Sequence, residues 1–185
     1  MKNGYREKRV ENIALIALFV SIISISSYIS LPFPIPFTMQ TFGIFLTVLC
    51  LGYIKGGIAV SCYVFLGALG APVFSGFSGG LAHLFTPTGG YIIGFIPSAF
   101  LTGWLISLAN KSKRRELWSF VAVEIGNIVL YLSAIIFYIT FYTEGDMLSR
   151  IGVSFSLCCL PYILPDCLKN LLAVQIGRRV EKILK

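Results

Sequence analysis

The stretch WSFVAVEIGNIVLYLSAIIFYITFY occupies residues 118–142 and carries one charged side chain, Glu124. About 20 predominantly apolar residues are enough for a helix to cross the roughly 30 Å hydrocarbon core of a bilayer. This stretch is longer than that, so it predicts a transmembrane helix that can tilt. The fold of the chain therefore depends on how many runs of this kind it contains.

The composition of the whole chain agrees with a membrane location. Of its 185 residues, 56% are hydrophobic and 12% are charged, which is about half the charged fraction of a soluble domain. The formal net charge of +7 would suggest a nucleic-acid partner in a soluble protein. Here the basic residues cluster between apolar runs, a pattern that indicates membrane topology, so no nucleic-acid partner is expected.

Five further apolar runs are separated by charged, proline-rich or glycine-rich segments. They lie at residues 13–31, 37–54, 58–69, 91–109 and 165–184. The proline-rich linker 32–36 cannot continue a helix, and residues 151–164 are interpreted as a loop with a lateral helix that lies on the bundle. The sequence therefore predicts an all-α membrane protein, a six-transmembrane-helix bundle that forms a single integral membrane domain over residues 1–185.

The distribution of Lys and Arg predicts the orientation of this bundle. If both termini are cytoplasmic, 13 of the 15 Lys and Arg residues lie on the inside, as the positive-inside rule requires. The proline-rich linker, the glycine-rich loop 70–90 and the start of the last helix then lie at the outer face. We therefore expect a multi-pass protein of a bacterial-type plasma (inner) membrane, with a pocket open to the exterior.

The segment LPDCLKN, residues 164–170, places an acid and a base at the start of the last apolar run. Asp166 and Lys169 are three residues apart, so a helix presents both on one face. Ionisable groups inside a membrane bundle are costly and are kept mainly where they contact something. The pair is therefore the first candidate for ligand binding. The alternatives are a structural ion pair, or side chains that extend to the membrane interface.

Three other residues offer polar or aromatic groups within the spans. Gln40 has an amide with one acceptor and two donors, which suits an amide or urea ligand and equally an interhelical hydrogen bond. Asn127 shares a helix face with Glu124, and both a ligand contact and a structural role are open for it. Tyr91 can stack on a ligand or belong to the aromatic belt at the membrane interface.

Catalysis and metal binding are not predicted. The five cysteines form no C-x-x-C pair and are expected to be free thiols. His83, the single histidine, has no second metal-type ligand near it in the sequence and is interpreted as a loop residue. Nucleotide-binding and nucleophile–base motifs are also absent from the sequence. We therefore expect no enzyme and no cofactor, and any energy for active transport would enter through partner subunits.

Several motifs together are similar to a known family. They are PIPFTMQT at 34–41, LGALGAPVF at 66–74, GGL at 79–81, TPTGGYIIGF at 86–95 and PDCLK at 165–169. In order and spacing they resemble the BioY family, the biotin-specific substrate-binding (S) components of energy-coupling-factor (ECF) transporters. The resemblance covers nearly the whole chain. The chain departs from many members at Pro165, where they have glycine, and at residues 131–133, where a glycine is often found.

This resemblance implies a function, partners and a site. The function is high-affinity capture of biotin at the extracytoplasmic face, for uptake driven by two cytoplasmic ATPase subunits through a transmembrane scaffold subunit. Ala17 and Ser21 resemble the small-residue pattern on which such components dock to the scaffold. In the implied site, two charged, two amide and three aromatic residues contact the ligand: Asp166, Lys169, Gln40, Asn127, Tyr91, Phe37 and Phe74.

Two other functions fit the same residues. One is an S component for another vitamin, with the same bundle and a differently filled pocket. The other is a membrane assembly protein without a transport role, in which the pair of Asp166 and Lys169 holds helices together.

Overall fold

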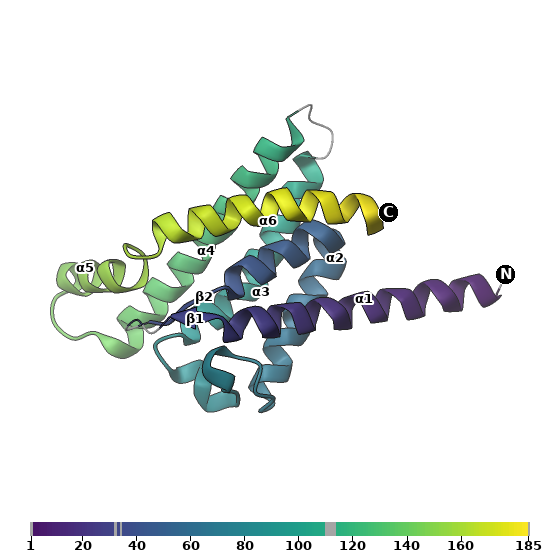
Figure 1. Ribbon diagram of the computed structural model, residues 1–185. Coiled ribbons are helices and arrows are strands. Elements are labelled where there is room, and N and C mark those ends of the chain that lie inside the picture. Colours follow the sequence, from purple (N-terminus) through teal and green to yellow (C-terminus); the bar gives the residue numbers. More distant parts are fainter. Residues whose placement is uncertain (1, 32, 34, 110–113, 185) are drawn as a thin grey trace.

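The computed structural model describes residues 2–31, 33, 35–109 and 114–184, which are mostly helical. The elements run in the order α1 (Lys2–Tyr28), β1 (Ser30–Leu31), β2 (Phe37–Thr38), α2 (Gln40–Ala68), η1 (Ser75–Phe77), η2 (Leu81–Phe85), α3 (Gly89–Ala109), α4 (Arg115–Tyr142), α5 (Met147–Cys158) and α6 (Ile163–Leu184) (Figure 1). The strands β1 and β2 pair antiparallel. The predicted helical class is confirmed, with this short hairpin added.

Long apolar helices make the chain a multi-pass membrane protein. Among the described residues, α1, α2, α3 and α4 are each long and apolar enough to cross a membrane. Helices α5 and α6 pass the same test only as a pair, which is bent by 48° at the short break between them. The predicted runs 91–109 and 118–142 coincide with α3 and with most of α4.

Helix α2 contains a sharp bend where the sequence predicted a turn between two spans. Gly52 has non-helical angles, φ 77° and ψ −172°, and a positive φ favours glycine because it has no Cβ. A Cβ placed on Gly56 would lie 2.9 Å from the Cα of Val48. In a continuous helix these residues would be about 12 Å apart along the axis. The predicted boundary at Lys55 is therefore three residues late.

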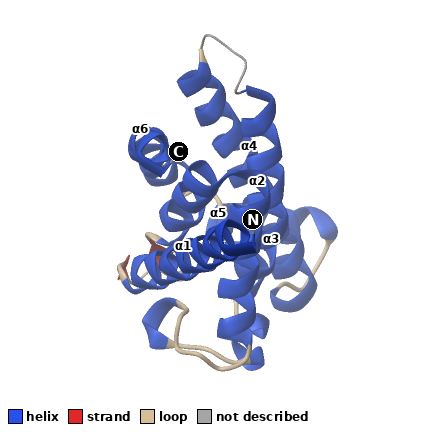
Figure 2. Ribbon diagram, turned by 90° about the vertical axis from the view of Figure 1, so that its right-hand side faces the viewer, coloured by secondary structure: helices blue, strands red, loops and turns tan. Residues whose placement is uncertain are grey.

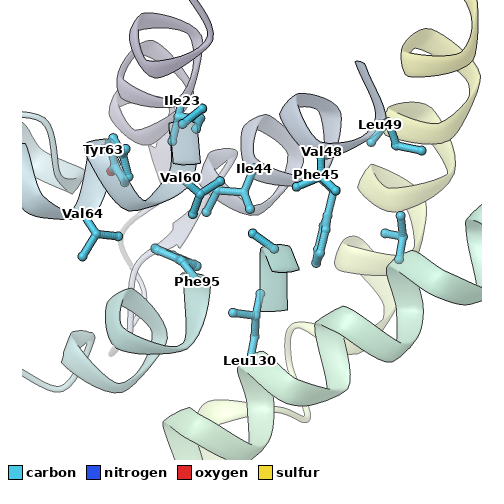
Figure 3. Packing of buried hydrophobic residues seen from close by; sticks show 14 of the residues in the cluster. Ile23, Ile44, Phe45, Val48, Leu49, Val60, Tyr63, Val64, Phe95 and Leu130 are labelled. Carbon is cyan, nitrogen blue, oxygen red and sulfur yellow. The ribbon is translucent and has the colours of Figure 1, made fainter. Parts of the chain in front are cut away.

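The bent α2 is the centre of the bundle. It contacts α1, α3 and α6, while α4 packs on α3 and α6. Small residues allow the close approach of α3 to α4, because a Cβ on Gly90 would lie 2.9 Å from the Cα of Ala134. The core joins both segments of α2 to the four helices α1, α3, α4 and α6. Figure 3 labels part of it, including Ile23, Ile44, Phe45, Val48, Val60, Tyr63, Val64, Phe95 and Leu130.

The two ends of the bundle differ. Both chain termini lie at one end, and the β-hairpin and the junction of α5 with α6 lie toward the other (Figures 1 and 2).

The lateral helix predicted within 151–164 is α5. It begins earlier, because Asp146 caps it by accepting from the Ser149 N–H at 3.2 Å. Pro165 lies in the first turn of α6, where its missing N–H removes no helix hydrogen bond. The predicted linker 32–36 and basic loop 111–115 lie partly outside the described residues.

Candidate functional site

A pocket lies at the end of the bundle away from the chain termini. Its cavity is small, about 50 Å³, which is below the usual range for small-molecule sites. Its walls come from the hairpin and the start of α2, the loop before α3, the start of α3 and the start of α6. The lining residues are Ile35, Pro36, Phe37, Thr38, Gln40, Thr41, Phe74, Ser75, Thr88, Tyr91, Ile92, Phe95, Tyr162, Asp166 and Lys169.

Lys169 is the cationic group of this pocket. Its ammonium lies 2.5 Å from the Oδ1 of Asp166 and donates to the Thr38 carbonyl oxygen at 2.8 Å and to the Thr41 Oγ1 at 2.9 Å. It also lies 4.1 Å from the centre of the Phe37 ring, a cation–π arrangement. Lys169 is only 6% exposed. A buried ammonium requires such partners, and these bring the hairpin, α2 and α6 together at one point.

Asp166 is the anionic group, and its two oxygens have different partners. Oδ1 faces Lys169, while Oδ2 accepts a hydrogen bond from the Tyr131 hydroxyl at 2.6 Å. Asp166 is 5% exposed and lies in the first turn of α6, where the positive end of the helix dipole favours a carboxylate. Asp166 and Lys169 are therefore paired with each other. A neutral donor, the Tyr131 hydroxyl, also binds Asp166, and neutral acceptors on Thr38 and Thr41 also bind Lys169.

Aromatic rings form much of the remaining wall. The rings of Phe37 and Tyr162 are stacked, with centroids 6.2 Å apart and an interplanar angle of 11°. The hydroxyl of Tyr91 donates to the Cys158 carbonyl oxygen, and that of Tyr162 donates to the Ile35 carbonyl oxygen. Because both hydroxyls are bonded to the backbone, these tyrosines present mainly ring surface to the pocket.

The glycine-rich loop contributes Phe74, which is fully buried. Its ring lies between Tyr63, at 5.7 Å, and His83, which stacks on it at 5.4 Å. Burial lowers the pKa of His83 from its ordinary value of 6.5. At neutral pH the imidazole that stacks on Phe74 is therefore uncharged. On the α2 side, a Cβ on Gly67 would lie 2.1 Å from the Phe74 Cζ.

Gln40 lines the pocket but already has a protein partner. Its Nε2 donates to the Tyr63 hydroxyl at 2.6 Å, and that hydroxyl donates to the Val73 carbonyl oxygen at 2.9 Å. The hydrogen bond joins the two segments of α2 beneath the glycine-rich loop. The interhelical hydrogen bond left open by the sequence is therefore present, and this bond uses the amide nitrogen and not the amide oxygen.

The structure brings six of the seven predicted site residues to this one pocket: Asp166, Lys169, Gln40, Tyr91, Phe37 and Phe74. The seventh, Asn127, does not line it. Asn127 lines a separate groove of about 430 Å³ between α4, α5 and α6, together with Glu124 and Tyr131. The sequence shows that Asn127 and Glu124 share a helix face, but not what that face borders. In the structure it borders the groove and not the pocket.

Sequence reasoning missed the neutral partners of the ion pair. Thr38 and Thr41 lie in the PIPFTMQT motif, and only the packing of the hairpin against α6 shows that they hold Lys169. Tyr131 is 35 residues from Asp166 in the chain. The sequence feature that could have identified Tyr131 is its position four residues after Asn127, on the polar face of α4.

The predicted docking residues Ala17 and Ser21 both lie on the exposed surface of α1. The Ser21 hydroxyl donates to the Ala17 carbonyl oxygen at 3.0 Å. A serine bonded in this way to its own helix presents a small and largely satisfied surface, as close helix packing requires.

A second ion cluster lies at the opposite end, between α4 and α6. Glu181 accepts from Arg178 at 2.9 Å and from Arg115 at 2.7 Å. Arg178 is 5% exposed and also donates to Ser119. Among the described residues, no group of three His, Cys, Asp or Glu side chains is placed to hold a metal ion.

The sequence matches the BioY family over residues 1–185. The chain belongs to the BioY family. A relative named as a probable biotin transporter BioY, from Pyrococcus horikoshii, is 37% identical over 94% of this chain and 98% of its own length. The biotin transporter BioY of Thermotoga maritima is 36% identical over 90% of this chain and 93% of its own length. The predicted resemblance is confirmed.

A solved crystal structure also matches the fold. The crystal structure of the S-component for biotin from an ECF-type ABC transporter superposes with a TM-score of 0.83 and 27% identity. The match covers 98% of this chain and 95% of the other. The bundle is thus that of an S-component, the substrate-binding part of a transporter.

Proposed function

We propose that the protein is the biotin-binding S component of an ECF-type ABC transporter and captures biotin at the extracytoplasmic face. The observation that carries this proposal is a buried, self-paired Asp166 and Lys169 in a pocket with aromatic walls. Biotin has a urea head with two N–H donors and a carbonyl acceptor, an apolar sulfur-containing ring, and a carboxylate tail. The names of the relatives and of the matching crystal structure support the same ligand.

The polar groups of the pocket complement those of biotin. Asp166 accepts from a urea N–H group, and Lys169 donates either to the urea oxygen or to the carboxylate. The rings of Phe37, Phe74 and Tyr91 cover the apolar ring. A buried charge left unpaired is strongly unfavourable. The pair therefore stays closed in the empty pocket and exchanges part of its mutual contact for the ligand.

For the membrane topology we propose six spans in one integral domain, residues 1–185, with both termini in the cytoplasm of a bacterial-type inner membrane. The bend at Gly52 divides α2 into two spans, and the pair of α5 and α6 supplies the last one. Support comes from the 13 of 15 Lys and Arg residues on the inner side and from the two termini at one end of the bundle (Figure 1). The pocket then opens outward.

The proposed partners are a transmembrane scaffold subunit and two cytoplasmic ATPases, with this chain itself not acting as an enzyme. The exposed Ala17 and Ser21 on α1 form the docking surface for the scaffold. The support is the small-residue pattern and its exposure, together with the match to a part of an ECF-type transporter.

The test of this function is the identity of the bound small molecule. Protein purified from cells supplied with a vitamin mixture is denatured, and the released compounds are identified by mass spectrometry. We expect biotin, and titration calorimetry should give one site for biotin and no heat with thiamine or riboflavin. Recovery of another vitamin, with no binding of biotin, would overturn the proposal.

Gly67→Ala is expected to weaken biotin binding by roughly tenfold, because overpacking of this size costs about 1–3 kcal/mol. The new methyl group would overlap the Phe74 ring, which also contacts Tyr63 and His83, so the ring of this pocket-lining residue has to shift. The measurement is titration calorimetry on detergent-purified protein. The matched control is Gly152→Ala in α5, where a Cβ meets open space. Equal affinities for the two variants would contradict the assignment of Phe74 to the ligand wall.

A further inference from the structure

Tyr131 stands between the ligand pocket and the groove beside it. Its side chain lines the groove with Glu124 and Asn127, and it is not among the residues that line the pocket. Its hydroxyl nevertheless donates to the Oδ2 of Asp166 at 2.6 Å, and Asp166 lines the pocket. This hydrogen bond therefore connects a residue of the groove on α4 to a residue of the ligand pocket on α6.

This bond determines how the carboxylate is presented. A carboxylate has about four acceptor positions on its two oxygens. Lys169 uses one position on Oδ1, and Tyr131 uses one on Oδ2. Because one donor sits on each oxygen, both oxygens keep an acceptor position, and the carboxylate plane is fixed. Without the hydroxyl, the carboxylate is free to rotate and place both oxygens against the Lys169 ammonium.

We propose that Tyr131 is a positioning residue that sets ligand preference. It holds Asp166 so that a free acceptor position of the carboxylate faces one N–H donor of a cyclic urea. Tyr131 does not itself contact the ligand. This inference rests on the proposed binding of biotin and goes beyond it, because it assigns the preference for a ligand with an N–H donor at this position to a residue outside the pocket.

A double-mutant cycle tests the inference. Tyr131→Phe is made in the wild-type chain and in the Asp166→Asn chain, and biotin affinity is measured by titration calorimetry. We expect Tyr131→Phe to weaken binding roughly tenfold in the wild-type chain and by less than about twofold in the Asp166→Asn chain. The matched control is Tyr138→Phe, two turns further along α4, with unchanged affinity.

A second readout separates positioning from general support of the fold. A biotin analogue methylated at the urea nitrogen that faces Asp166 loses this N–H donor, so the wild-type protein should discriminate strongly against it. Tyr131→Phe should reduce this discrimination by roughly the same tenfold factor and should leave the discrimination against biotin methyl ester unchanged. A structural defect would weaken all three ligands alike.

The outcomes distinguish the two levels of the proposal. If the wild-type chain fails to bind biotin, the proposed function falls. If it binds biotin and Tyr131→Phe binds equally well, or loses affinity equally in both backgrounds, only the role of Tyr131 is overturned. Thermal unfolding of each variant in detergent checks that its fold is retained.

Discussion

Replacing Asp166 by asparagine or Lys169 by alanine is expected to weaken biotin binding by about tenfold or more in each case. Hydrogen bonds to charged groups contribute roughly 1.5–3 kcal/mol, and about 1.4 kcal/mol corresponds to a factor of ten in affinity. Each substitution also leaves the other member of a buried pair without its counter-charge. Titration calorimetry on purified protein measures both effects.

The control for this pair is Gln175→Ala, which removes a polar side chain from the exposed surface of the same helix, α6. It should bind biotin like the wild-type chain. Unchanged affinity in both Asp166→Asn and Lys169→Ala would reject the proposed site.

The double substitution Asp166→Asn with Lys169→Gln separates a binding pair from a structural one. It removes both charges together and keeps side chains of similar size that can still bond to Tyr131 and Thr41. We expect a folded protein that does not bind biotin. An assembly protein held together by this pair would instead lose its fold, with a large fall in the midpoint of thermal unfolding.

Glu181→Gln is expected to destabilise the fold by about 3 kcal/mol without altering the ligand pocket. The substitution removes the carboxylate that lies between two guanidinium groups, those of Arg115 and Arg178. Breaking a buried ion pair from one side costs about 3–5 kcal/mol. The lower value applies because the Arg115 side chain is 35% exposed and solvent screens its charge.

Unfolding in detergent with increasing denaturant measures this change. The matched control is Glu144→Gln, which removes the same charge from an exposed loop position and should leave stability within about 0.5 kcal/mol of wild type. Biotin affinity should be retained by both variants under native conditions. A Glu181→Gln protein as stable as the control would show that the cluster does not connect α4 to α6.

Much of the fold could be predicted because apolar length is a local property. The run 118–142 marks most of α4, and 91–109 marks α3, since charges and glycines end these helices within the sequence itself. The bend in α2 was placed three residues late. Lys55 and the glycines after it suggested a turn, but the bend lies at Gly52, whose positive φ favours glycine, and it brings Gly56 against Val48.

The candidate site could be predicted only in part. Asp166 and Lys169 are visible because charges are rare in apolar runs and these two share a helix turn. Helical periodicity tells which residues share a face, but not what that face meets. Asn127 was therefore expected at the ligand, whereas its face of α4 borders the groove. Tyr131, on the same face, reaches Asp166 only because α4 and α6 pack together there.

The most direct measurement is a structure of the protein with biotin bound. We predict biotin in the pocket of Phe37, Phe74 and Tyr91, with hydrogen bonds to Asp166 and Lys169 and fewer contacts between those two side chains than in the empty protein. Biotin bound elsewhere, with the pair still closed on itself, would contradict the account.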